Sequence, residues 1–211
     1  VKDTTNFGRA FQPGTGLGIV TNPFLGFDRP RMVSLNANQI IGNTVINNGS
    51  AGISTVSNVK GVVRSNLAAH NGFQSPFGGA FPGNGIGVTY AHNATPNTNE
   101  LVENNQVYGN GRDGIEVVAS GNQILNNIGN GNGAGAFGGF DFRDFDSDPV
   151  TFQPSCSTNT WSGNQWGSGG FFPQCVSNGG SPLPGTTAQA MPMGPPEPDG
   201  LGDPPPRISP S

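Results

Sequence analysis

The clearest chemical signal in this 211-residue chain is a short acidic stretch with three alternating aspartates, Asp144, Asp146 and Asp148. A D-x-D-x-D spacing lets three carboxylates converge on a hard cation such as Ca²⁺, the one cofactor that the sequence suggests. An EF-hand loop is excluded, because Pro149 stands where that loop needs glycine and Ser155 where it needs a bidentate acid. The alternative interpretation is a solvated loop whose aspartates cap turns and pair with Arg143.

A second group of charged residues follows an asparagine-glycine pair and consists of Arg112, Asp113 and Glu116. Arg64 and Glu103 add a further cation and acid at matching places in two repeats, which are described below. Carboxylates and bases near arginine are the groups from which acid–base chemistry is built. No known catalytic motif matches their spacing, so the alternative is a set of salt bridges on the surface.

Aromatic residues and one histidine gather in two apparent insertions: Phe77, Phe81, Tyr90 and His92. Their rings could form a wall that stacks on sugars, or they could fold the long loops down onto the repeat beneath them. The only other histidine is His70, and neither histidine has a cysteine or second histidine at metal-ligand spacing. A zinc site is therefore not expected.

The elements that must position these residues are repeats rich in asparagine and glycine. The phrase "NQIIGNTVINNGSAGI" at 38–53 nearly recurs as "NQILNNIGNGNGAGAF" at 122–137. Shorter copies centre on Asn66 and on "NQVYGNGRDGI", and a degenerate copy is "NTWSGNQW". In the copy at 122–137 we take Ala136 and Phe137 as the closing pair that matches Gly52 and Ile53.

The spacing of these copies predicts a solenoid. Successive leading asparagines are 23, 39, 22 and 37 residues apart, which is a period near 22–23 with two interruptions. An inward Ile or Val precedes the asparagine in four copies and Trp161 in the degenerate one, so stacked coils about 4.8 Å apart would share a continuous core. The asparagines would then form an amide ladder, and the asparagine-glycine pairs would supply positive φ at the corners. The predicted ladder is Asn43, Asn66, Asn105, Asn127 and Asn164.

The pattern "GN-x-φ-x-N-x-x-x-GI" resembles the repeats of right-handed parallel β-helix proteins, the pectin-lyase-like superfamily. The resemblance covers roughly residues 18–176. It implies an all-β, right-handed parallel β-helix of about five coils, and a group that contains polysaccharide lyases, glycoside hydrolases and proteins without known activity. For lyases it implies arginine or lysine facing a uronate, here Arg64, Arg112 or Lys60. For hydrolases it implies paired carboxylates, here Asp113 with Glu116.

The block "CSTNTWSGNQWGSGGFFPQC" resembles the closing segment of secreted bacterial β-helix repeat proteins. The resemblance implies a disulfide between Cys156 and Cys175, which would close a loop worth about 3 kcal/mol. It also implies an extracellular or cell-surface location. The alternative is two free buried thiols in a cytosolic protein.

The domain organisation predicted from these patterns has three parts. Residues 1–35 form an irregular segment in which "GLGIV" at 16–20 could be the last strand of an earlier coil. Residues 36–176 form the β-helix, with insertions at 73–84, 90–99 and 138–155. Residues 177–211 read as a disordered proline-rich tail. The chain begins without methionine, and we expect further coils upstream.

Charge and hydropathy limit the partners. A net charge of −4 without a basic stripe makes nucleic acid an improbable partner, and no apolar run is long enough to span a membrane. Two functions remain open: a secreted protein that binds or acts on polysaccharide, such as an acidic-polysaccharide lyase or hydrolase, or a non-catalytic structural or surface-interaction solenoid. Oligomeric state is not predicted.

Overall fold

The computed structural model describes residues 17–20, 37–49, 51–56, 59–72, 83–89, 99–135, 138–145 and 158–186. Within these ranges the chain consists of short strands and one 3-10 helix, η1 (Gln174–Ser177). The first sheet contains β1 (Leu17–Val20), β4 (Ile53–Val56), β7 (Ile86–Thr89), β10 (Ile115–Val117), β13 (Phe142–Asp144) and β16 (Phe171–Phe172). The second contains β2 (Gln39–Ile41), β5 (Val62–Arg64), β8 (Leu101–Glu103), β11 (Gln123–Leu125) and β14 (Thr160–Ser162). The third contains β3 (Thr44–Ile46), β6 (Leu67–Ala69), β9 (Gln106–Tyr108), β12 (Ile128–Asn130), β15 (Gln165–Trp166) and β17 (Ser181–Pro182).

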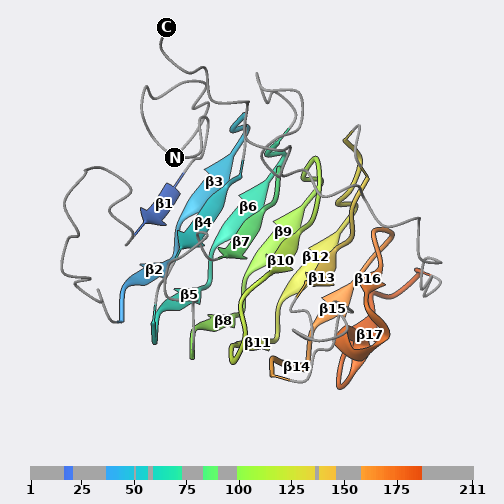
Figure 1. The fold of residues 1–211 in the computed structure, drawn as a ribbon. Coiled ribbons are helices and arrows are strands. Elements are labelled where there is room, and N and C mark those ends of the chain that lie inside the picture. The colour runs from blue at the N-terminus through green and yellow to red at the C-terminus, as the bar shows by residue number, and fades with distance from the viewer. Residues whose placement is uncertain are drawn as a thin grey trace, which may run out of the picture.

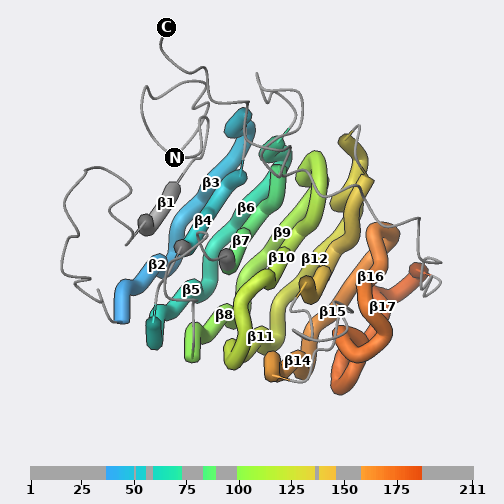
Figure 2. The backbone as a smooth tube through the Cα atoms, in the orientation of Figure 1, coloured from blue at the N-terminus to red at the C-terminus, as the bar shows by residue number. Residues whose placement is uncertain are grey.

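The chain is a parallel β-helix, as the repeat spacing predicted. Each of the first five coils gives one strand to each sheet in turn. Neighbours in a sheet come from successive coils, and every described strand pair is parallel (Figure 1). The smooth backbone trace shows the coils stacked in chain order from one end to the other (Figure 2). Five coils contribute to all three sheets. In the sixth, η1 packs against β14 and replaces the strand of the second sheet.

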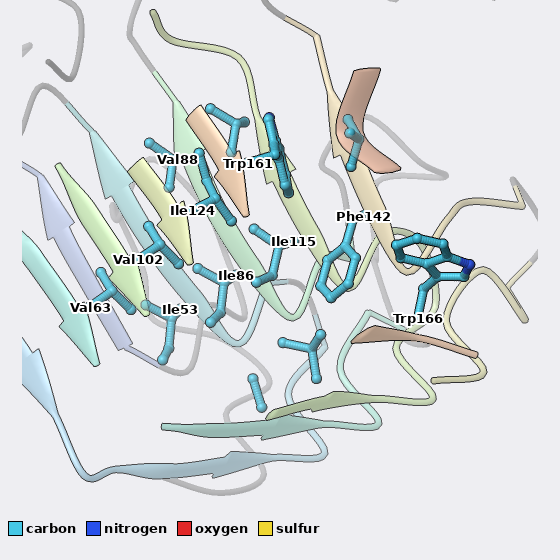
Figure 3. Packing of buried hydrophobic residues seen from close by; sticks show 14 of the residues in the cluster. Ile53, Val63, Ile86, Val88, Val102, Ile115, Ile124, Phe142, Trp161 and Trp166 are labelled. Atoms are coloured by element: carbon cyan, nitrogen blue, oxygen red, sulfur yellow. The ribbon is translucent and has the colours of Figure 1, made fainter. Parts of the chain in front are cut away.

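The core follows from the alternation of side chains along each strand. In the first sheet the inward column is Ile53, Ile86, Ile115, Phe142 and Phe171, all buried and in register. The middle coils carry aliphatic residues, while the last coils carry the aromatic ones (Figure 3). The Phe142 and Trp161 rings lie 6.1 Å apart, and Trp166 meets Phe171 edge-on at 4.7 Å. These large side chains close one end of the core.

The predicted asparagine ladder is confirmed. From Asn43 through Asn66, Asn105 and Asn127 to Asn164, each Nδ2 donates to the Oδ1 of the next asparagine at 3.0 Å. The backbone N–H of each donates to the same oxygen, and the Nδ2 of Asn105 also donates to the Val63 carbonyl at 2.9 Å. Each amide thus satisfies its polar atoms in the interior, where an unmade hydrogen bond is costly.

A second ladder runs parallel to the first and ends on a carboxylate. It links Asn48, Asn71, Asn110 and Asn132, and the Nδ2 of Asn132 donates to Asp141 Oδ1 at 2.7 Å. The other oxygen of Asp141 accepts the N–H groups of Gly167 and Gly169. Gly169 stands where the next ladder asparagine would be, and a Cβ there would lie 2.5 Å from Asp141 Oδ1. Asp141 therefore replaces that asparagine.

A third polar column, which the sequence analysis missed, lies at the remaining corner. The Glu100 N–H donates to Asn122 Oδ1 and the Asn122 N–H to Asn159 Oδ1. The Nδ2 of Asn159 and the Nε1 of Trp161 then donate to the buried Asp144 carboxylate. In two coils Gly61 and Glu100 stand where this column would otherwise have asparagine, so the repeat could not be recognised from the sequence.

The corners obtain their positive φ from the residue before each ladder asparagine. In the first ladder these residues are Gly42, Ser65, Asn104, Asn126 and Gly163, and all have φ between 54° and 69°. The expectation that asparagine-glycine pairs supply this conformation holds for Gly72 and Gly133, whose φ values are 87° and 85°. It is wrong for Gly49 and Gly111, which are not among the positive-φ glycines. The ladder position therefore needs asparagine for its side-chain hydrogen bonds and not for a positive φ.

The closing pair of the fourth repeat was wrongly placed. Strand β10 pairs with β13 so that Ile115 lies opposite Phe142, which makes Asp141-Phe142 the equivalent of Gly114-Ile115. Residues 142–144 are thus a regular strand of the solenoid, and the predicted insertion at 138–155 is wrong over these residues. Residues 136–137, 146–157 and most of the other two insertions (73–82 and 90–98) lie outside the described residues.

Both ends of the solenoid differ from the predicted boundaries. Strand β1 pairs with β4, so the segment "GLGIV" does supply a strand of an earlier coil. At the other end β17 pairs with β15, and the fold extends past residue 176 to include η1 and β17. The predicted start of the tail at 177 is therefore too early. Residues 187–211 lie outside the described residues.

Candidate functional site

The residues with most chemical potential form a cluster on the outer side of the first sheet, which we call the charge cluster: Asn84, Arg112, Asp113, Glu116 and Arg143. Alternation along β10 turns its two flanking apolar side chains inward and Glu116 outward. The strand register then places Arg143 of β13 directly beside Glu116. Arg112 and Asp113 occupy the corner just before β10.

Hydrogen bonds and ion pairs connect the members of the charge cluster. Asn84 Nδ2 donates to Glu116 Oε2 at 2.5 Å, and Arg112 Nη2 lies 3.7 Å from Glu116 Oε1. Asp113 Oδ2 lies 3.5 Å from both Arg112 Nε and Arg143 Nη1. The other oxygen, Asp113 Oδ1, accepts the N–H of Phe140 at 2.8 Å. The cluster therefore joins coils that are about thirty residues apart in sequence.

Burial controls the protonation of this cluster. The pKa of Asp113 is raised from 3.8 to about 7, chiefly because burial desolvates the carboxyl group and also because the negative charge of Glu116 lies nearby. Arg143, Arg112 and the Phe140 N–H oppose this rise in pKa. Within the described part of the chain Asp113 Oδ2 makes ion pairs but accepts no hydrogen bond. Two acids and two arginines leave the ionised cluster formally neutral.

Aromatic rings surround the outer arginine. The Arg143 guanidinium lies 4.0 Å from the ring centroid of Phe145 and 5.8 Å from that of Phe140. Phe140 stacks on Phe172 with centroids 5.5 Å apart. Phe145 is 36% exposed, which is unusual for a large apolar residue in this structure. We call Phe140, Arg143, Phe145 and Phe172 the guanidinium–aromatic patch.

The accessibility of the two carboxylates limits the chemistry they can perform. A general acid or base must come within hydrogen-bond reach of the substrate. Asp113 is 0% exposed and Glu116 4% exposed, and both already bind partners within the protein. The predicted grouping of Arg112, Asp113 and Glu116 is confirmed, but the two acids are buried and are neutralised by Arg112 together with Arg143.

Arg64 and Glu103 lie elsewhere. They pair in register on β5 and β8 of the second sheet, and their side chains form the ion pair expected from the repeat alignment. Lys60 is an exposed corner residue with φ 58° just before β5. The structure does not bring these three residues to the charge cluster, so the predicted catalytic residues fall into two separate sets.

The predicted calcium ligands are divided in the same way. Asp144 is fully buried and accepts hydrogen bonds from Asn159 and Trp161, so its carboxylate faces the interior. Asp146 and Asp148 lie outside the described residues. Across the described ranges no three His, Cys, Asp or Glu side chains are grouped so that they could hold a metal ion.

Several other predicted residues are not tested. Phe77, Phe81, Tyr90 and His92, the candidate sugar-binding residues, lie outside the described residues. Cys175 lies in η1, but Cys156 is likewise outside, so the disulfide stays a prediction.

The sequence analysis missed Asn84 and the true role of Arg143. Arg143 was expected to pair with neighbouring aspartates, but it pairs with Asp113 one coil earlier. Correct placement of Phe142 opposite Ile115 would have put Arg143 beside Glu116. The signal that could have revealed the role of Arg143 is therefore the register between β10 and β13, and not a local sequence motif.

In the part of the chain that the structure describes, no helical segment has the length and hydropathy of a transmembrane span. Comparison with known proteins yields no matching family model, no matching curated protein and no matching solved structure. The parallel β-helix is thus established by the three stacked sheets and the amide ladders of this chain alone.

Proposed function

We propose that this chain is a non-catalytic solenoid whose function is structural or depends on binding through its outer surface. The observation that carries the proposal is the state of the charge cluster. Its two acids are buried, and their carboxylate oxygens already contact the arginines and Asn84 of the cluster. Buried ion pairs of this kind hold neighbouring elements in register and are poorly placed to contact a polymer outside.

The second sheet supports the same proposal. Its only described charged pair, Arg64 with Glu103, is mutually neutralised. The outward positions beside this pair are apolar or uncharged, including Val62, Leu101 and Gln123. A regular, nearly uncharged surface of this kind suits contact with an extended partner more than it suits acid–base chemistry.

An activity screen tests this proposal directly. Uronate polymers and neutral polysaccharides are incubated with the protein, with and without Ca²⁺, and are followed by the ultraviolet absorbance of unsaturated products and by reducing ends. We expect neither signal. Turnover that disappears in Asp113→Asn and Glu116→Gln, while the circular dichroism spectrum stays that of the wild type, would overturn the proposal.

A second candidate function, polysaccharide binding, is favoured by the guanidinium–aromatic patch. Phe145 is exposed beside Arg143, and aromatic faces next to polar groups are typical of surfaces that stack on sugar rings. Because Asp113 pairs with Arg143, the patch favours neutral polysaccharides over uronates. Binding on a glycan array that Phe145→Ala abolishes and Ile41→Ala retains would support this function. Absence of any glycan binding would leave the structural function alone.

We further propose that the protein acts outside the cytoplasm, at the cell surface or beyond it. The support is the pair of cysteines that bracket the last regular coil, since disulfides persist in oxidising compartments. Mass analysis of the protein purified without reductant tests this, because a disulfide lowers the mass by two hydrogens. Alkylation of both cysteines under native, non-reducing conditions would contradict it.

A further inference from the structure

Seven asparagines in this chain are followed by glycine, and all seven lie within the described residues: Asn48, Asn71, Asn84, Asn110, Asn130, Asn132 and Asn178. Asparagine is a thermolabile residue. Its side-chain amide is lost when the backbone nitrogen of the next residue attacks Cγ, and glycine hinders this attack least because it has no side chain. Because the seven dipeptides are chemically identical, differences in their reactivity in the folded chain depend on their structural environments.

Five of these asparagines are buried and held by hydrogen bonds. Asn48, Asn71, Asn110 and Asn132 form the second ladder, in which each Nδ2 donates onward to the next acceptor. Asn84 is buried and donates to Glu116. Attack on any of these Cγ atoms first requires the amide to leave its partners, so local opening must precede the chemistry.

Asn130 is exposed, but its backbone is fixed. It ends β12, which pairs with β9 on one side and with β15 on the other. Its carbonyl accepts the Gly109 N–H at 3.1 Å, and its Oδ1 accepts the Ser168 N–H at 3.2 Å. Movement of the Gly131 nitrogen toward Cγ would disturb both coils.

Asn178 is in a different environment. It is exposed at the C-terminal end of η1, where its backbone N–H bonds to the Cys175 carbonyl. In the described part of the chain its side chain makes no hydrogen bond, and the N–H of Gly179 donates to no backbone carbonyl. The nucleophile and the electrophile of the reaction are thus both unoccupied.

We propose that Asn178 is the spontaneous deamidation site of this protein. The Gly179 nitrogen loses its proton and bonds to Asn178 Cγ, and the side-chain nitrogen leaves as ammonia to give a succinimide. Water then opens the ring to aspartate or isoaspartate. Ring closure needs rotation of Asn178 about ψ from 124°, which disturbs the closing turn, held by the bond from the Gly180 N–H to the Ser177 carbonyl and by the bond from the Gly163 N–H to the Gly179 carbonyl.

The product would alter the end of the solenoid. The Gly179 carbonyl accepts the Gly163 N–H at 2.6 Å, and this bond joins the closing turn to the preceding coil. Isoaspartate lengthens the backbone by one methylene beside that carbonyl, and either product adds a negative charge. The modified chain should therefore lose this contact and unfold more easily at its closing end.

The test is peptide mapping by mass spectrometry after incubation of the folded chain at mildly alkaline pH in ¹⁸O-labelled water. Conversion of amide to acid should be at least about tenfold faster at Asn178 than at any of the other six positions, because those must first lose hydrogen bonds. It should be slower than in a short peptide with the sequence VSNGGS. In urea-unfolded protein all seven positions should react at similar rates.

Two controls make the outcome decisive. Asn178→Gln should remove the fast reaction and leave the six slow ones unchanged. The proposal is overturned if a ladder asparagine or Asn130 reacts as fast as Asn178 in the folded protein. It is equally overturned if Asn178 stays unmodified over a period in which the unfolded chain reacts at all seven positions.

Discussion

The amide ladders and the charge cluster bury polar groups by opposite means. In the first ladder every asparagine from Asn66 to Asn127 donates to and accepts from a neighbour in the adjacent coils. In the charge cluster Asp113 Oδ2 and Arg143 Nε are buried without hydrogen bonds, although both side chains have ionic neighbours. Neutral amides repeat with the period of the coil and so satisfy one another, whereas charges must be matched one by one.

This difference means that the ladders should dominate stability and the cluster should dominate its pH dependence. A ladder member leaves several partners unpaired when it is removed, and it does so at any pH. A carboxylate of the cluster changes its contribution with its protonation. The predictions below test that contrast, from the largest expected effect to the smallest.

Removal of a central ladder amide should have the largest effect. Asn105→Ala removes the acceptor of the Asn66 N–H and the side-chain donor to the Val63 carbonyl, and it leaves the Asn127 oxygen with one of its two donors; all three groups are buried. With about 1–3 kcal/mol for each unsatisfied group, we expect a loss of about 4 kcal/mol or more. Urea unfolding followed by circular dichroism measures it. Gln106→Ala, a change at the exposed neighbour on β9, should cost less than about 1 kcal/mol, and equal losses for the two would refute the ladder's role.

Replacement of the carboxylate that ends the second ladder should come next. Asp141→Asn can still accept from Asn132, but its new NH2 group would face the N–H groups of Gly167 and Gly169. We expect a loss of about 3 kcal/mol, because buried donors then meet without an acceptor. Thermal unfolding checks this value. Unchanged stability would show that a carboxylate is not needed there.

The charge cluster should reveal itself in pH dependence. Because burial raises the pKa of Asp113 to about 7 in the folded protein, the folded form holds this proton more tightly than the unfolded chain does. The contribution of Asp113 to stability is therefore fully present below about pH 4, falls as the pH rises from about 4 to 7, and is lowest above that. Between about pH 5 and 8 the wild type should lose about 2–3 kcal/mol more than Asp113→Asn, which cannot titrate.

Denaturant unfolding at several pH values measures this difference. Parallel stability profiles for the wild type and Asp113→Asn would show that Asp113 ionises in the folded protein as it does in water. The same series with Ser54→Ala, a change on the same outer face of the first sheet, serves as the control because it removes no titrating group.

The surface ion pair should matter least. Arg64 is 42% exposed, and exposed pairs contribute about 0.2–1 kcal/mol. A double-mutant cycle with Arg64→Ala and Glu103→Ala should give a coupling energy in that range, reduced by added salt. A coupling energy above about 2 kcal/mol would contradict this and would mean that the pair stabilises the fold as much as a ladder contact does.

The sequence predicted the parts of the fold that repeat with strict spacing. Asn43, Asn66, Asn105, Asn127 and Asn164 fall in one column because the inward apolar residue and the asparagine keep a constant separation in every coil. The same alignment correctly placed Arg64 beside Glu103. Local spacing is sufficient wherever consecutive strands are joined by a corner of fixed length.

The prediction failed where the connection between strands varies in length. Ala136-Phe137 matches the small-then-apolar pair that closes the other repeats, but Asp141-Phe142 holds that place in the structure. That slip concealed both the end of the second ladder and the position of Arg143 in the charge cluster. Contacts between coils depend on register, and no single stretch of the chain contains that information.

The one-way course of the amide ladders has a consequence for how such a chain can change in length. An extra coil that carries asparagine at the same corner could be spliced between two existing coils, because it would offer the same acceptor to the coil before it and the same donor to the coil after it. A coil added after Asp141 would meet a carboxylate that offers no donor in return. We therefore expect lengthening by duplication to be tolerated in the middle of this solenoid and rejected at its aromatic end.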